Sequence, residues 1–68
     1  MLSDLLLWNK IGRIVTLLSE RLDISPEYAL ELYYLSDTNE RLHDEKTKLY
    51  TFGDRYIVDE LIREIQER

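Results

Sequence analysis

The chain has 68 residues, contains no cysteine and carries a formal net charge of -5. A chain of this length forms one domain at most, and its stability is marginal unless a disulfide, a metal, regular helix packing or a partner chain adds to it. The lack of cysteine excludes disulfides and thiolate metal sites, and a single histidine, His43, excludes most zinc geometries. Regular helix packing and association with another chain remain as sources of stability.

Charge and hydropathy restrict the classes of partner. The nine Lys and Arg residues are interspersed among fourteen Asp and Glu residues, so the chain lacks the basic stripe with which proteins hold a nucleic-acid backbone. A basic surface on another protein is a better electrostatic match. The longest apolar run, residues 5–8, is far shorter than a membrane span, and the N-terminus lacks a signal-peptide pattern. Together with the absent cysteines, these features predict a cytoplasmic protein.

The first predicted helix covers residues 4–22, with Ser3 or Asp4 as its N-cap. At ~100° per residue, seven of its apolar residues fall within an arc of roughly 120°, which is wide enough to face a core. They are Leu7, Trp8, Ile11, Ile14, Val15, Leu18 and Leu22. Gly12 lies inside this helix at a cost of about 1 kcal/mol relative to alanine. We expect it to mark a place where another helix crosses closely.

Leu6 and Leu17 lie to the side of this arc, about 20° from each other on the helical wheel. Two interpretations remain open. Scattered leucines on a protein surface are common and need no function. Alternatively, the two leucines form a second, shallower strip that contacts a partner chain.

The second predicted helix covers residues 26–36. Ser25 is its expected N-cap, and Pro26 occupies the first helical position, where its missing N–H does no harm. Apolar residues lie on nearly every side of this helix, which predicts burial on more than one side. So small a domain offers few neighbours to cover it, and the exposed side of Tyr33 and Tyr34 is therefore the second candidate surface for association.

Residues 38–43 are predicted to form a short helical turn, followed by an ordered loop that ends at Phe52. We expect Leu49, Tyr50 and Phe52 to fold back over the core. Periodicity does not decide whether this part of the loop is extended or a turn.

The last predicted helix covers residues 54–67, with Asp54 as its N-cap. It is the clearest amphipathic helix of the chain, because its apolar residues span roughly 140° of the wheel and charged residues take the other side. Those apolar residues are Ile57, Val58, Leu61, Ile62 and Ile65. Tyr56 falls on the polar side, where it can cover the preceding loop or meet a partner.

Standard phosphate, zinc and hydrolase motifs are absent from the sequence. One cluster, His43-Asp44-Glu45, contains groups that can bind a divalent ion or exchange protons. Its spacing does not match a calcium-binding loop, and a solvated turn is the simpler interpretation. We therefore expect no enzyme activity and no cofactor.

The segments at 24–30, 32–38, 42–50 and 56–61 read ISPEYAL, LYYLSDT, LHDEKTKLY and YIVDEL. Over roughly residues 14–66 the chain resembles a family of short bacterial helical proteins of unknown function. Members of that family are often encoded beside a toxin gene, in some cases for an ADP-ribosyltransferase-like toxin. The resemblance implies an antitoxin-like or accessory binding role and carries over no catalytic residue. Lys48 stands where relatives commonly have glycine.

The sequence thus predicts a single all-α domain, a compact bundle of three main helices with a short helical turn and an ordered loop. The predicted function is a protein–protein interaction module whose partner is a second copy, as a homo-oligomer, or a neighbouring gene product. A self-associating structural homodimer is the alternative, and a metal-assisted enzyme around His43 is a weaker one. The candidate partner-binding residues are Leu6, Leu17, Tyr33, Tyr34 and Tyr56.

Overall fold

The computed structural model describes residues 4–67, and over this range the chain is entirely helical or irregular, without a strand. The all-α prediction is confirmed, although the region expected to be a helical turn is a fourth α-helix. The elements are α1 (Asp4–Leu22), α2 (Pro26–Tyr34), α3 (Asp37–His43), the 3-10 turns η1 (Glu45–Thr47) and η2 (Leu49–Thr51), and α4 (Asp54–Gln66).

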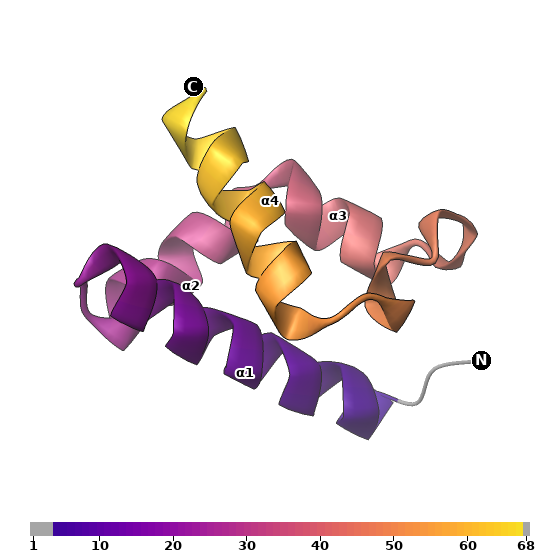
Figure 1. The fold of residues 1–68 in the computed structure, drawn as a ribbon. Helices are drawn as coiled ribbons and strands as arrows, with labels where there is room; N and C mark the ends of the chain where they lie inside the picture. The colour runs from indigo at the N-terminus through magenta and orange to yellow at the C-terminus, as the bar shows by residue number, and fades with distance from the viewer. Residues whose placement is uncertain (1–3, 68) are drawn as a thin grey trace.

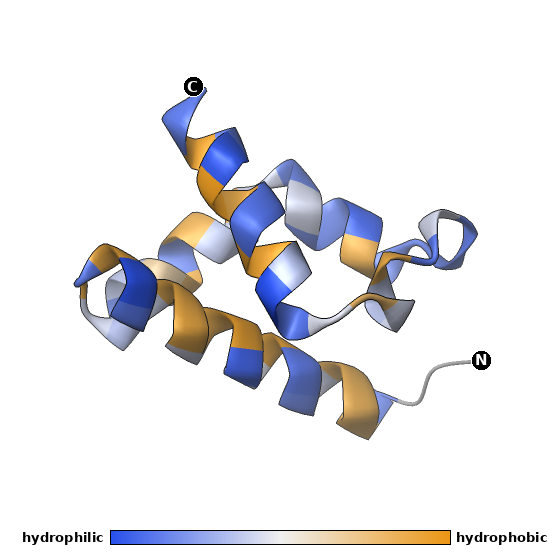
Figure 2. Cartoon of the chain, viewed as in Figure 1, coloured by the Kyte–Doolittle hydropathy of each residue, from blue (hydrophilic) through white to orange (hydrophobic). Residues whose placement is uncertain are grey.

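The longest helix, α1, forms the base on which α2 and α4 both pack, while α3 packs against α4 and α2 (Figure 1). Over the middle of α1, hydrophobic positions lie toward these helices and most hydrophilic positions lie on the other side (Figure 2). Ile14, Leu18, Ile57 and Leu61 are completely buried where α1 and α4 contribute to the core. Burial of one large aliphatic side chain contributes about 1.5–3 kcal/mol, so this shared core is the main source of stability.

The connection between α1 and α2 is fixed by local hydrogen bonds. The N–H of Ile24 donates to the carbonyl oxygen of Ser19 at 3.0 Å, while Asp23 adopts a left-handed conformation with φ 55°. This arrangement ends a helix and turns the chain sharply. The N–H of Tyr28 then donates to the Ser25 hydroxyl at 3.1 Å, which confirms Ser25 as the N-cap of α2. A short connection of this kind keeps α1 and α2 side by side.

The prediction that the second helix reaches residue 36 is wrong, because α2 ends at Tyr34. Ser36 belongs to the next helix as its N-cap. Its hydroxyl donates to the carbonyl oxygen of Tyr33 and accepts from the N–H of Asn39. One side chain thereby stops one helix and starts the next. The carboxylate of Glu64 on α4 adds to this start, since it accepts from the backbone N–H of residue 37 at 2.7 Å.

Asp54 was expected to cap α4, but Gly53 occupies the N-cap position and Asp54 is the first helical residue. The carboxylate of Asp54 instead contacts the Nζ of Lys10 at 3.0 Å and the Nε of Arg13 at 2.8 Å. Burial alone would raise the pKa of the Asp54 carboxyl, but hydrogen bonds from Arg13 and Lys10 and their positive charges outweigh burial and lower it. These ion pairs hold the start of α4 against the middle of α1.

The segment between α3 and α4 is an ordered loop, as predicted, and it consists of turns rather than an extended stretch. Leu49 is buried, as expected, and Tyr50 is half-buried. Phe52 does not cover the core, because it is 44% exposed and stacks on Tyr56 with 4.9 Å between ring centroids. Lys48 adopts a left-handed conformation with φ 55°, which a glycine adopts without steric cost.

We predict that Lys48→Gly raises the free energy of unfolding by about 1 kcal/mol, because an L-residue in the left-handed region is strained by roughly 1–2 kcal/mol. Chemical denaturation of both proteins measures the difference. Lys46→Gly is the matched control, because Lys46 lies within η1 and has no positive φ. It removes the same charge and is expected to lower stability. A Lys48→Gly protein less stable than wild type would contradict the prediction.

We also predict that Asp54→Asn lowers the free energy of unfolding by about 1 kcal/mol at neutral pH. Because folding lowers the pKa of Asp54, its contribution is present above the unfolded pKa of about 3.9 and is lost as pH falls through the folded pKa. When thermal unfolding is measured between about pH 6 and pH 2, the melting temperatures of wild type and Asp54→Asn should therefore become similar at the acidic end. A difference in melting temperature that stays constant over this pH range would contradict the role of Asp54. Glu67→Gln, at the exposed residue that follows α4, controls for loss of one carboxylate.

Candidate functional site

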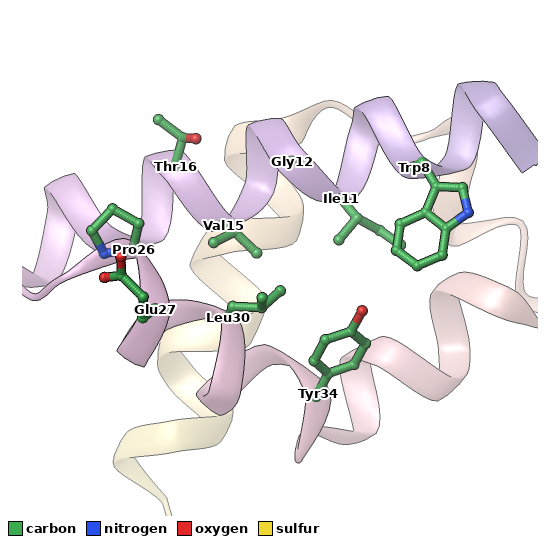
Figure 3. Close-up of a pocket in the computed structure, with 9 residues that line it drawn as sticks. All are labelled: Trp8, Ile11, Gly12, Val15, Thr16, Pro26, Glu27, Leu30 and Tyr34. Atoms are coloured by element: carbon green, nitrogen blue, oxygen red, sulfur yellow. The ribbon is translucent and has the colours of Figure 1, made fainter.

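A groove of about 430 Å³ lies between α1 and α2. The two helices diverge from their connection, so that Pro26 lies near α1 at one end of the groove and Trp8 and Tyr34 lie at the other end (Figure 3). The residues that line it are Trp8, Ile11, Gly12, Val15, Thr16, Pro26, Glu27, Leu30 and Tyr34.

The helical repeat explains why these residues meet. On α1, Trp8, Gly12 and Thr16 follow one another at intervals of four residues, and on α2 the residues Pro26, Leu30 and Tyr34 do the same. Residues four apart lie one above the other on one side of a helix. Each series therefore forms one wall of the groove. Buried Ile11 and Val15 provide an apolar floor between the walls.

The large apolar side chains of the walls remain substantially exposed. Trp8 is 60% exposed, Tyr34 48% and Leu30 38%. Leu5, one turn before Trp8, is 70% exposed. Single exposed apolar residues are ordinary, whereas a contiguous group around a groove is typical of a binding surface. The prediction that Trp8 belongs to the core is wrong. On the helical wheel of α1, Trp8 lies at the edge of the side that α2 and α4 cover.

Gly12 lies at the centre of the groove wall and does not mark a close helix crossing, contrary to expectation. A Cβ placed on it would have no atom within 4 Å, and its φ is not positive. Neither the described packing nor the backbone geometry therefore requires glycine at this position. Gly12 also borders a second hollow of about 450 Å³ on the outer side of α1, which includes Leu17 and Glu20. The missing side chain leaves an open strip along the middle of α1.

Among the predicted site residues, only Tyr34 lines the groove. Leu17 is half-buried, packs against the core and lines the neighbouring hollow. Leu6 is 59% exposed but is not part of either lining. The predicted strip of Leu6 and Leu17 is therefore not one uniform exposed surface, because the core covers part of Leu17.

Tyr33 was expected at the exposed side of the second helix, and this prediction is wrong. The residue is completely buried and belongs to the core with Ala29, one turn earlier. Burial raises the pKa of the Tyr33 hydroxyl far above its ordinary value, and neighbouring Tyr34 adds to the rise. Tyr56 is 46% exposed, but it stacks on Phe52 and lies outside the groove. The five predicted residues thus do not form one site.

Sequence reasoning missed Trp8, Gly12 and Leu30 as site residues. One signal was available, because a glycine inside a helix has a cost that some close approach usually explains. The repeat of Trp8, Gly12 and Thr16 also indicated a flat strip beside an aromatic residue. The opposite wall was not visible in the sequence, because the rotation of α2 about its axis decides that Leu30 and Tyr34 face the groove.

Three carboxylates lie along the groove and its margins. Glu27 lines the groove, Glu31 follows it one turn later on α2, and Glu20 lines the neighbouring hollow on α1. All three are exposed, and within residues 4–67 no cation pairs with them. The cations of α1 are engaged elsewhere: Lys10 and Arg13 with Asp54, as described above, and Arg21 with Asp59 at 2.9 Å.

The cluster around His43 is used locally. The Nδ1–H of His43 donates to the carbonyl oxygen of Asn39 at 2.8 Å, and the Asp44 carboxylate accepts from the N–H of Lys46 at 3.0 Å. Within the described range, no three His, Asp or Glu side chains are grouped so that they could hold a metal ion. No helix between residues 4 and 67 has both the length and the apolar composition needed to cross a membrane.

Comparison of the chain with protein-family models, with curated proteins and with solved structures found no match. The resemblance to short bacterial helical proteins therefore remains a hypothesis.

We predict that Gly12→Ala stabilises the isolated protein by about 1 kcal/mol, because alanine favours a helix and its methyl group meets open space. For a domain of this size, the melting temperature should rise by about 4–8 °C. Gly53→Ala provides a control of opposite sign, because Gly53 is the N-cap of α4 and alanine is a poor N-cap. Destabilisation by Gly12→Ala would mean that the position is closely packed.

Proposed function

We propose that the protein is an interaction module that docks a segment of another protein chain into the groove between α1 and α2. The observation that carries this proposal is the half-exposed set of Trp8, Leu30 and Tyr34 around the open strip at Gly12. Tryptophan and tyrosine are enriched at the energetic centres of interfaces. Their place around a groove favours partner contact over incidental exposure.

The energy available from the groove fits reversible binding. Complete burial of a large apolar side chain contributes about 1.5–3 kcal/mol, so covering the remaining half of three such residues contributes about 3 kcal/mol. Ordering the partner and restricting its motion oppose this gain. Apolar contact alone therefore gives weak binding, and polar contacts at the margins of the groove have to add to it.

An antitoxin-like or accessory role is compatible with such a module. A small domain that covers a segment of a larger protein can inhibit that protein by occupying a surface it needs. The resemblance set out above suggests a neighbouring gene product as the partner. The alternative is a second copy of this chain, and it draws support from the exposed Leu5 and Leu6 in the first two turns of α1.

The proposal predicts which surface a partner requires. Leu30→Glu places a charge in the groove, while Leu6→Glu and Tyr56→Glu place one at two predicted partner-binding residues outside it. Each protein is expressed in its source cells with a purification tag, and crosslinked partners are quantified by mass spectrometry. Leu30→Glu should lower recovery of a specific partner by about tenfold or more, because an unpaired charge is costly to bury. The other two changes should have less than about a twofold effect.

Circular dichroism checks that all three variants remain helical. Partner recovery that survives Leu30→Glu but is lost in Leu6→Glu would contradict the proposal. Light scattering on the purified proteins addresses the alternative. A wild-type dimer that dissociates on Leu30→Glu would favour a structural homodimer instead.

A further inference from the structure

The dimensions of the groove suit a short helix. From Trp8 to Thr16 the wall of α1 extends over eight residue steps, which is about 12 Å or two helical turns. An incoming helix of that length places two or three apolar side chains at intervals of three and four residues. Gly12, in the middle of the wall, allows its backbone or a large side chain to approach α1 closely.

The architecture also favours a helix over an extended segment. One recurring way in which extended peptides bind is to add a strand to the edge of a sheet, and residues 4–67 contain no strand to which one could be added. A helix, in contrast, packs its side chains into the channel between two neighbouring helices. With α1 and α2 as the two walls, an incoming helix completes a three-helix arrangement on this side of the molecule.

The charges at the groove determine the chemistry of the occupant. Glu20, Glu27 and Glu31 are exposed and unpaired within the described chain, and α2 itself contains no lysine or arginine. An occupant with lysine or arginine on its flanks would pair with these carboxylates and associate faster. A second copy would bring the same carboxylates and a charge of -5 of its own, which opposes association. Anionic lipid and nucleic acid are disfavoured for the same reason.

We infer that the groove between α1 and α2 receives a short amphipathic helix of a different protein, with apolar anchors toward Trp8, Gly12 and Leu30 and basic residues on its flanks. This inference rests on the proposed function and adds the conformation and charge of the partner segment. Its anchors bind between the two walls. Its basic side chains contact the carboxylates of Glu20 on α1 and of Glu27 and Glu31 on α2.

The test is a peptide-display selection against the full-length protein. The library encodes helix-forming peptides of about 14 residues, long enough for roughly 21 Å of helix, with apolar, acidic and basic residues equally represented at the varied positions. Selected peptides are synthesised, and their affinities are measured by fluorescence anisotropy at low and high salt. The expected peptides carry apolar residues at i, i+3 or i+4 and i+7, with lysine or arginine beside them.

Two matched triple variants separate charge at the groove from overall charge. Glu20→Gln/Glu27→Gln/Glu31→Gln neutralises the groove carboxylates, and Glu40→Gln/Glu45→Gln/Glu67→Gln removes the same number of charges from α3, η1 and the end of α4. The first variant should weaken binding of the selected peptides by about tenfold and reduce its salt dependence. The second should change affinity by less than about twofold. Gly12→Leu, which fills the groove, should weaken binding more than tenfold.

The outcomes distinguish failure of this inference from failure of the proposed function. If Gly12→Leu abolishes binding of the selected peptides but the two triple variants bind them equally well, the groove remains a docking site. The inference that the partner helix has basic flanks is then overturned. Selection of acidic or proline-rich extended peptides also overturns it. If no peptide is selected, or if selected peptides bind Gly12→Leu as tightly as wild type, both this inference and the proposed function fail. If the wild-type protein forms a dimer through the groove, the inference that the occupant belongs to a different protein is overturned.

Discussion

The apolar side of α1 is the surface on which the structure is assembled. Helices α2 and α4 both pack on it, and Ile14 and Leu18 are completely buried between them. However, α1 has 19 residues, whereas α2 has 9 and α4 has 13. The shorter helices therefore leave part of the first turns of α1 uncovered. Trp8 and its neighbour Leu5 lie in that region, at the end of the groove where α1 and α2 have diverged.

Polar contacts fix how the helices meet and thereby set the charge of the groove. Asp54 occupies both Lys10 and Arg13, so two of the cations of α1 are engaged on the α4 side. Glu64 ties α4 to the start of α3 through the N–H of residues 37 and 38. The carboxylates that remain without a partner in the described chain include Glu27 at the groove. The same contacts that stabilise the core thus leave Glu20 and Glu27, beside the groove, without a cation from the described chain.

Sequence reasoning succeeded where a local interaction decides the outcome. Ser25 caps α2 because its hydroxyl accepts a hydrogen bond from a residue three positions later, and that interaction needs no other part of the chain. It failed where several neighbouring residues compete for one role. Ser36, within a run of four residues that can cap a helix, starts α3 and thereby shortens α2. At the start of α4, Gly53 occupies the N-cap position without a side-chain hydrogen bond, and the neighbouring Asp54 side chain contacts α1.

The sequence by itself determined that the chain is helical and acidic, and approximately where its helices begin and end. Only the tertiary structure decided that Tyr33 is buried and that Trp8 and Leu30 face a groove. The reason is geometric. Periodicity fixes the angle between two residues on the same helix, but the exposure of a side chain depends on the length and crossing angle of the neighbouring helices. Because the groove lies between two helices, the sequence of either helix alone indicates at most one of its walls.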